Sequence, residues 1–404
     1  MRATKQMNSF VLASILAVGS IFAGQPALRD IWARHDRIVM SGRGSTMNLD
    51  PAQSHIFKGM SGRTVRGWDI GRTDIPAVLW FPGGPGDPAN PALDVYCFED
   101  ANAYRHLEID PPGTGLSSWV PGWKPEDTVD DAAAFLRLRG INAPILVTGY
   151  SWGSTMALLF AQRHPDMVSG VVIGGVWANT RQEVAAYLGE NGNRTWMPGL
   201  QDSFRKIVHG PLTATAFHRA IRNGQGGKPF ASAYGDAEFL QCMEGQNPRK
   251  PLIDEIQIVE ANPVDMFTEK DEGVRFAFIE SEMMSRGERG KWALKIRFDK
   301  RLSGVPIIVL QGRYDQVCSR EIAMRVFDAW PCKDKLLVPM NGGHWGFSGP
   351  NKETFASTGL SLTEAQVISL RKAMAIHFGS DRALVGASID LLTKTKPEDH
   401  SICP

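Results

Sequence analysis

The chain has 404 residues with 43% hydrophobic and 22% charged side chains, and 44 Lys and Arg against 43 Asp and Glu leave a formal net charge of +1. This composition is typical of a globular protein and excludes a disordered or fibrous one. The balanced charge provides no basic field on the scale of a domain, so it predicts a protein without a nucleic-acid partner. The length allows one large domain with an insertion, or two domains.

The first residues of the chain predict export. Arg2 and Lys5 lie in an N-terminal stretch without acids, and residues 9–23, SFVLASILAVGSIFA, are apolar or small throughout. This arrangement is typical of a signal peptide, here within residues 1–24, and the run is shorter than the roughly 20 residues that cross a bilayer. We therefore expect a secreted or periplasmic protein. The large residues of Ile21-Phe22-Ala23 suit signal cleavage poorly, so an N-terminal membrane anchor is the alternative.

The cysteines indicate neither a disulfide framework nor a metal site. They are five in number and none has CxxC spacing: Cys97, Cys242, Cys318, Cys332 and Cys403. One or two disulfides could form in an exported protein, and the spacing does not determine the pairing. The sequence contains no HExxH motif, and no phosphate-binding glycine motif follows a predicted strand. We therefore expect neither a metal nor an organic cofactor.

Short apolar stretches alternate with helical runs along most of the chain. The expected strands are residues 76–81, 104–109, 143–149, 167–175, 305–312 and 335–340, and the expected helices are 127–140, 154–165, 263–287 and 363–379. Short apolar strands separated by amphipathic helices predict an α/β fold, in which helices cover both faces of a mostly parallel sheet. Residues 177–303 are mixed in pattern and richer in charge, which predicts an inserted helical lid between two core segments, residues 31–176 and 304–404.

Ser151 is the candidate nucleophile. The run GYSWG, residues 149–153, follows an apolar strand and precedes an apolar-periodic helix, which is the context that the nucleophile-elbow motif requires. The serine must occupy a strained turn, so the residues two before and two after it must be small. The N–H of Trp152 and the positive end of the helix would lie beside an oxyanion formed at Ser151. The alternative is a Gly-Ser turn whose glycines only permit tight helix–strand packing.

A serine hydroxyl needs a base and an acid that orients the base. On an α/β sheet these follow the serine in the order acid, then histidine, each just after a strand. Asp315 lies three residues beyond the strand-ending Gly312, and His344 lies four residues beyond Met340, after Asn-Gly-Gly. We therefore expect Asp315 and His344 to complete a triad with Ser151, although a turn aspartate and a loop histidine are the alternatives.

The competing residues fit this pattern less well. His164 ends the helix after Ser151, where a surface cap is expected, and His377 lies within a helical run. His209 and His218 lie in the predicted lid, and Asp110 precedes Ser151 in the chain.

A glycine-rich loop after the strand 76–81 supplies the second half of the expected oxyanion hole. In WFPGGPGDP, residues 80–88, the glycines let the backbone approach a substrate closely. Pro85 has no N–H, so the donor is expected to be Gly83 or Gly84. A phosphate-binding loop is the rival interpretation, and the sequence has no GKS, GKT or GxGxxG at this point.

Four segments together resemble the proline iminopeptidase family, serine aminopeptidases of the α/β-hydrolase superfamily. The family patterns HGGPG, DQRGxGxS, GGSWGS and GRYDxxCP are similar to PGGPG (82–86), DPPGTGLS (110–117), GYSWGS (149–154) and GRYDQVCS (312–319). The resemblance implies an α/β-hydrolase fold with a helical lid, Ser151, Asp315 and His344 as the triad, and the N–H groups of Trp152 and Gly84 or Gly83 as the oxyanion hole.

The departures from the family bear on the substrate. Pro82 replaces a histidine, Pro111-Pro112 replace Gln-Arg, and Tyr150 replaces a glycine beside the nucleophile, so Tyr150 is a candidate substrate-binding residue. An aminopeptidase must also bind a protonated amine, which favours carboxylates. In the family these come from the lid, and FIESEMM, residues 278–284, resembles the segment that carries one. Glu280 is therefore the candidate and Glu282 the next, with a solvated helix face as the alternative.

The sequence thus predicts an exported serine hydrolase that cleaves N-terminal residues, proline among them, from short peptides or amino-acid amides. The alternative on the same fold is an esterase, lactonase or amide hydrolase of specialised metabolism. A binding protein on a hydrolase scaffold is the rival from another class. The oligomeric state is not predictable from the sequence.

Overall fold

The computed structural model describes residues 53–60, 62–89, 91, 105–189, 204–205, 207–208, 210–224, 272–312, 315–340 and 344, with the backbone alone at 272 and 338–340. The predicted signal peptide or anchor and the predicted helix at 363–379 therefore lie outside the described residues. Among the described residues, no helix combines the length and the apolar character needed to span a membrane.

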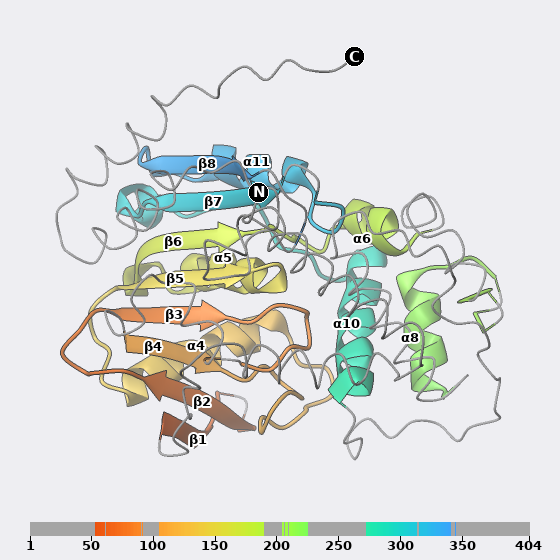
Figure 1. The fold of residues 1–404 in the computed structure, drawn as a ribbon, viewed down its shortest axis with the longest axis horizontal. Helices are drawn as coiled ribbons and strands as arrows, with labels where there is room; N and C mark the ends of the chain where they lie inside the picture. Colours follow the sequence, from red (N-terminus) through yellow and green to blue (C-terminus); the bar gives the residue numbers. More distant parts are fainter. Residues whose placement is uncertain are drawn as a thin grey trace, which may run out of the picture. The chain divides into compact units, whose positions relative to one another are not determined.

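An eight-stranded sheet forms the centre of the fold, with the strand order β1-β2-β4-β3-β5-β6-β7-β8 (Figure 1). The strands are β1 (Ser54–Lys58), β2 (Thr64–Ile70), β3 (Ala77–Phe81), β4 (Arg105–Ile109), β5 (Ile145–Tyr150), β6 (Val168–Gly174), β7 (Ile307–Gly312) and β8 (Lys335–Met340). β2 pairs antiparallel with both β1 and β4, and the remaining neighbours are parallel. The predicted mostly parallel sheet is confirmed.

The burial pattern of each strand agrees with the position of that strand in the sheet. All five residues of β4 and the first five of β5 are buried, as expected for parallel strands that are covered on both faces. In β2, near the sheet edge, buried and half-buried residues alternate. The apolar runs seen in the sequence are therefore the central strands.

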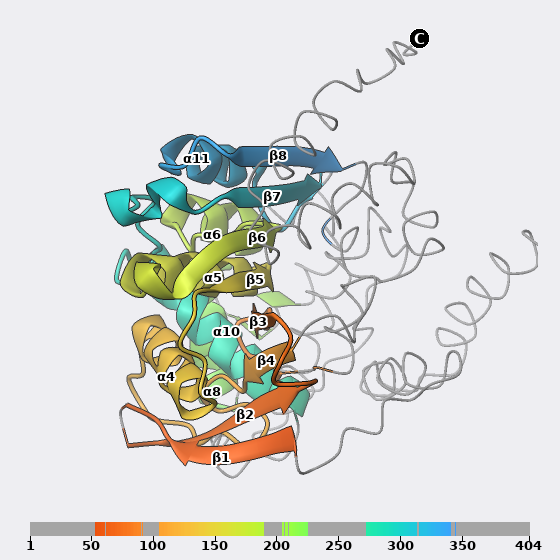
Figure 2. The same ribbon diagram turned by 90° about the vertical axis from the view of Figure 1, so that its left-hand side faces the viewer.

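Helices α4 (Pro125–Leu138), α5 (Trp152–Arg163) and α11 (Arg320–Ala329) lie on one side of the sheet (Figure 2). α4 begins with Pro125 and has Glu126 and Asp127 in its first turn, where a missing N–H and negative charge are both favourable. Residues 152–161 of α5 are all buried, and this helix packs against β3, β5 and β6 and against α4. The predicted alternation of strands and helices is confirmed.

Between β6 and β7 the structure describes the helices α6 (Arg181–Leu188), α8 (Ala214–Arg222) and α10 (Glu272–Glu288), followed by the short 3-10 helix η6 (Lys300–Gly304). α10 packs against α6 and α8. Figure 1 shows the three helices together beyond the ends toward which β3 and β6 point. This arrangement agrees with a helical lid, and its bounds at residues 177 and 303 stay a prediction.

Asn179 joins this helical region to the core. It is fully buried and adopts a positive φ of 58° directly before α6. Its amide donates to the carbonyl oxygen of Met283 in α10 at 2.9 Å and to that of Trp292 at 3.2 Å. One side chain thus connects the segment that leaves β6, the lid helix α10 and the segment that returns to β7.

Candidate active site

Ser151 occupies the sharp turn between β5 and α5. Its φ of 55° and ψ of −124° lie in a region that residues other than glycine rarely adopt, which indicates a locally strained backbone. Its N–H donates to the carbonyl oxygen of Gly174 at 3.0 Å, and its own carbonyl accepts from the N–H of Ser154 at 3.0 Å. These hydrogen bonds to β6 and to the first turn of α5 hold the strained residue in place.

The two glycines of the motif are needed for steric reasons. A Cβ atom on Gly149 would lie 2.2 Å from the carbonyl oxygen of Gly153, and one on Gly153 would lie 2.1 Å from that of Phe81. Both contacts are with backbone atoms, which cannot move aside. The strand–turn–helix context expected for a nucleophile elbow is therefore present.

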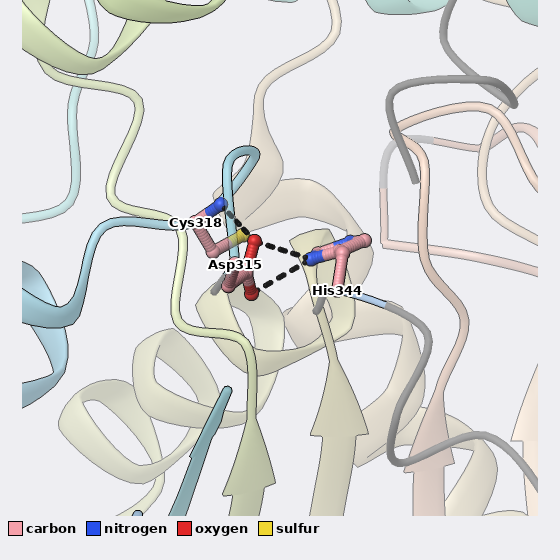
Figure 3. Close-up of side chains that lie close together, drawn as sticks. All are labelled: Asp315, Cys318 and His344. Carbon is pink, nitrogen blue, oxygen red and sulfur yellow. Dashed lines mark hydrogen bonds and ion pairs between the residues drawn. The ribbon is translucent and has the colours of Figure 1, made fainter. Parts of the chain in front are cut away.

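Asp315 and His344 lie together at the carboxyl ends of β7 and β8. The Nδ1 atom of His344 lies 2.9 Å from Oδ2 of Asp315 and 3.1 Å from Oδ1 (Figure 3). The carboxylate is fully buried and the imidazole side chain is only 4% exposed. Oδ1 also accepts the backbone N–H groups of Val317 at 2.9 Å and Cys318 at 2.8 Å. The carboxylate is thus held from two directions.

The hydrogen-bond roles follow from the chemistry of the carboxylate. An ionised carboxylate only accepts, so Nδ1 of His344 carries the proton and Nε2 is left as the basic nitrogen. The His344 ring centroid lies 4.9 Å from that of Tyr150, the residue immediately before Ser151. The fold therefore brings the acid, the histidine and the strand end that carries the serine to one edge of the sheet.

Cys318 is a further neighbour of this pair. Atoms of Asp315, Cys318 and His344 that could ligate a metal all lie within 4.8 Å of one another, and Cys318 is buried (Figure 3). Carboxylate, thiolate and imidazole are all zinc ligands. However, both carboxylate oxygens already accept hydrogen bonds, so the arrangement of Asp315 and His344 is explained by an acid–base pair. Cys332, the other cysteine among the described residues, is also buried.

The glycine-rich loop after β3 lies beside the serine. A Cβ atom on Gly83 would lie 3.9 Å from Cβ of Ser151 and 3.6 Å from the carbonyl oxygen of Tyr150. Gly84 and Gly86 have φ values of 98° and 124°, which only glycine adopts without strain. Trp152 is the first residue of α5, so its N–H has no acceptor within the helix. The loop that carries Gly83 and Gly84 and the first residue of α5 thus both lie next to Ser151.

Asp110 fixes this loop to the core. Its carboxylate accepts the N–H of Ala89 at 3.1 Å, the N–H of Leu116 at 2.9 Å and Nε of Arg66 at 2.5 Å. Burial raises the pKa of Asp110 above its usual value, although Arg66 and the two backbone donors lower it. Sequence reasoning considered Asp110 only as a rival triad acid. Asp110 is the first residue of the DPPGTGLS motif, and this motif could have indicated that its carboxylate holds two loops together.

The lid helix α10 lies against both loops. A Cβ atom on Gly86 would lie 3.1 Å from Cα of Phe276, and one on Gly113 would lie 3.2 Å from Cδ1 of Ile279. Glu280 is fully buried and follows Phe276 by four residues, so the two lie on the same face of the helix. The sequence did not reveal these contacts, because they join segments more than 150 residues apart.

The two candidate glutamates have different surroundings. The carboxylate of Glu282 forms an ion pair with Arg286 one turn later, and Arg286 also donates to the carbonyl oxygen of Trp123 at 2.6 Å. Glu280 lies instead on the loop-facing side of α10. The alternative of a solvated helix face is therefore wrong for Glu280, because its side chain is buried.

The competing histidines are accounted for in other ways. His164 is the C-cap residue of α5, as expected, and it is half-buried with Nε2 2.9 Å from Oδ1 of Asp130. Burial lowers the pKa of His164, and Asp130 opposes this. His218 lies in α8 with Nδ1 3.2 Å from Oγ of Ser281. His209 and His377 lie outside the described residues.

Comparison with known proteins identifies the family. The family model described as "alpha/beta hydrolase fold" matches residues 76–349, which is most of the chain. The chain belongs to the α/β-hydrolase fold family. This membership agrees with the strand order and confirms the predicted fold class.

The chain is also similar to proline iminopeptidases, as the four motifs predicted. It is 28% identical over 284 residues to the proline iminopeptidase of Xylella fastidiosa strain Temecula1, covering 68% of this chain and 85% of that protein. It is 26% identical to the Arabidopsis thaliana proline iminopeptidase, covering 73% and 76%. It is 27% identical to the Neisseria gonorrhoeae proline iminopeptidase, covering 70% and 87%. The protein is therefore a hydrolase similar to these peptidases.

Proposed function

We propose that this α/β hydrolase is a serine aminopeptidase, which removes N-terminal residues, proline among them, from short peptides or amino-acid amides. The observation that carries the proposal is the buried hydrogen bond between His344 and Asp315, beside the strand end that carries Ser151. This is the pairing that a serine nucleophile needs, with the acid orienting the base.

In the proposed mechanism, Nε2 of His344 removes the proton from Oγ of Ser151 as the oxygen attacks the scissile carbonyl. Asp315 keeps the proton on Nδ1 and stabilises the imidazolium that forms. The N–H groups of Trp152 and of Gly84 or Gly83 donate to the oxyanion. The leaving amine takes the proton from His344, and a water activated by His344 then hydrolyses the acyl-enzyme. Every step uses groups of the chain and water.

The exopeptidase part of the proposal rests on Glu280. A substrate with a free N-terminus carries an ammonium group, and a buried carboxylate binds such a cation more strongly than a solvated one. Glu280 is buried on the face of α10 that contacts the glycine-rich loop through Phe276. We propose Glu280 as the amine-binding carboxylate, with Glu282 as the second candidate.

Three substrates test the proposed activity on purified protein: a prolyl or other aminoacyl nitroanilide, its N-acetylated version, and a simple nitrophenyl ester. We expect cleavage of the free-amine anilide and strongly reduced cleavage of the blocked one. Equal cleavage of both anilides would contradict an aminopeptidase. Cleavage of the ester alone would favour an esterase or lactonase on the same fold.

We further propose that the protein acts outside the cytoplasm, in secreted, periplasmic or membrane-anchored form. The apolar run at residues 9–23 with Arg2 and Lys5 before it is the supporting observation. Cell fractionation followed by N-terminal mass spectrometry tests this. A protein found only in the cytoplasm with Met1 or residue 2 at its N-terminus would contradict it.

A further inference from the structure

The ring of Tyr150 packs against the imidazole of His344. The two ring centroids lie 4.9 Å apart with an interplanar angle of 44°. This geometry is within the range in which aromatic side chains attract one another. Tyr150 is the last residue of β5 and is bonded directly to Ser151. The contact therefore links the predicted base to the residue next to the predicted nucleophile.

Two consecutive glycines make room for this contact. A Cβ atom on Gly174 would lie 3.0 Å from Cδ2 of Tyr150. One on Gly175 would lie 3.1 Å from Cε2 of Tyr150 and 3.2 Å from Cε1 of His344. Gly175 also has a φ of 51°, which favours glycine. The end of β6 is thus shaped so that the two rings lie against the backbone and against each other.

Asp315 alone does not fix the orientation of His344. Both hydrogen bonds to the carboxylate are made by the single atom Nδ1, so they restrain Nδ1 more directly than Nε2 on the far side of the ring. A contact on the side of the ring restricts the motion of Nε2. Since the Tyr150 ring and Ser151 belong to adjacent residues, the same contact also sets where Nε2 lies relative to the serine.

We propose that Tyr150 is a positioning residue. Its ring holds the imidazole of His344 in the orientation that directs Nε2 toward Ser151. This inference rests on the proposed serine-hydrolase function. It differs from the sequence-based assignment of Tyr150 as a substrate-binding residue, because the ring is expected to act through His344. Substrate contact alone would change KM, whereas positioning changes the reactivity of Ser151 toward any electrophile.

The test compares Tyr150→Ala with Tyr150→Phe. A matched control is Phe57→Ala, since Phe57 is another half-buried aromatic, stacked on Phe135 at 5.4 Å near the edge of the sheet. Two quantities are measured: kcat and KM on the substrate cleaved best, and the second-order rate of Ser151 phosphonylation by diisopropyl fluorophosphate. This reagent has neither an amine nor an amino-acid side chain, so its reaction does not depend on recognition of either group.

For Tyr150→Ala we expect kcat and the phosphonylation rate to fall together by about 10- to 100-fold, with little change in KM, as for a slightly misplaced reacting group. Tyr150→Phe should restore both rates, because it retains the ring. Phe57→Ala should leave both rates unchanged. A Tyr150→Ala protein with an unchanged phosphonylation rate and a raised KM would overturn the proposal.

A spectroscopic measurement separates failure of this inference from failure of the proposed function. The low-field proton resonance of Nδ1–H in His344, identified by its loss in His344→Gln, reports the imidazole directly. We expect it to broaden or disappear in Tyr150→Ala and to persist in Tyr150→Phe, even if the protein cleaves no substrate. An unchanged resonance in Tyr150→Ala would overturn the positioning role whatever the activity.

Discussion

Nδ1 of His344 lies 2.9 Å from Oδ2 of Asp315, and the carboxylate is fully buried. The same carboxylate accepts two backbone N–H groups from the turn that follows β7. The acid is therefore held by the backbone of its own loop, and the acid in turn holds Nδ1 of the histidine. This order of dependence means that the acid can be altered with little loss of the surrounding fold.

Asp315→Asn should lower kcat by about 10⁴-fold, because an amide cannot hold the productive tautomer of His344 as a carboxylate does. The asparagine oxygen can still accept the N–H groups of Val317 and Cys318, so the thermal unfolding temperature should change little. Steady-state kinetics and calorimetry measure the two effects. A variant that retains at least a tenth of the activity would contradict the assignment of Asp315.

Glu280→Gln should lower kcat/KM for substrates with a free amine by about 10- to 100-fold, the effect of losing a hydrogen bond to a charged group. Activity on an N-acetylated or ester substrate should be unchanged. The matched control is Glu282→Gln on the same helix, which removes the ion pair with Arg286. If Glu282→Gln has the larger effect on free-amine substrates, Glu282 and not Glu280 binds the amine.

Asp110→Ala should destabilise the protein by about 3–5 kcal/mol, because it leaves Arg66 partly buried without its carboxylate. It also releases the N–H of Ala89, so the loop with Gly83 and Gly84 loses an anchor and kcat of the folded protein should fall. Urea unfolding and turnover at low temperature measure both. In the double variant Arg66→Gln with Asp110→Ala, stability should partly recover and kcat should not. Recovery of kcat together with stability would contradict a role in the loop.

Acidification should destabilise the protein through His218. Burial, with the positive charges of Arg222, Arg289 and Arg286, lowers the pKa of His218 from 6.5 to about 4. Between these pH values the unfolded chain binds a proton that the folded chain does not, so stability falls as the pH drops from 6.5 toward 4. The expected loss between about pH 7 and pH 5 is roughly 2 kcal/mol.

The readout for His218 is a comparison of urea unfolding at the two pH values for the unaltered protein and His218→Gln. The variant removes only this histidine, so the pH dependence due to all other groups cancels in the difference. Stability of the variant should decline by about 2 kcal/mol less on acidification. Identical pH dependence in the two proteins would show that His218 titrates normally.

The sequence predicted the features that depend on local pattern. Short apolar segments that end at glycines predicted the central strands and the turn at Ser151. They also predicted that Asp315 and His344 follow the ends of strands. The order of the residues along the chain then indicated which strand ends carry the triad candidates. Since these signals are contained within a few residues, one sequence was enough to find them.

The features that the sequence could not supply depend on tertiary contacts. The ring contact between Tyr150 and His344 joins residues that are 194 positions apart in the sequence. The residues on either side of each one in the sequence do not indicate this contact. The bonds of Asp110 to Ala89 and Leu116 likewise depend on how two loops meet. His164 was expected to cap the end of its helix, and it does so, but its contact with Asp130 of α4 could not be read from the sequence.

Covalent labelling shows directly whether Ser151 is the nucleophile. The folded protein is treated with a fluorophosphonate, digested, and analysed by mass spectrometry, with Ser151→Ala and His344→Gln as controls. We expect one adduct per chain on the peptide that contains Ser151, none in Ser151→Ala, and much slower labelling in His344→Gln. A folded protein that remains unlabelled, or that is labelled on another serine, would contradict the assignment of Ser151 as the nucleophile.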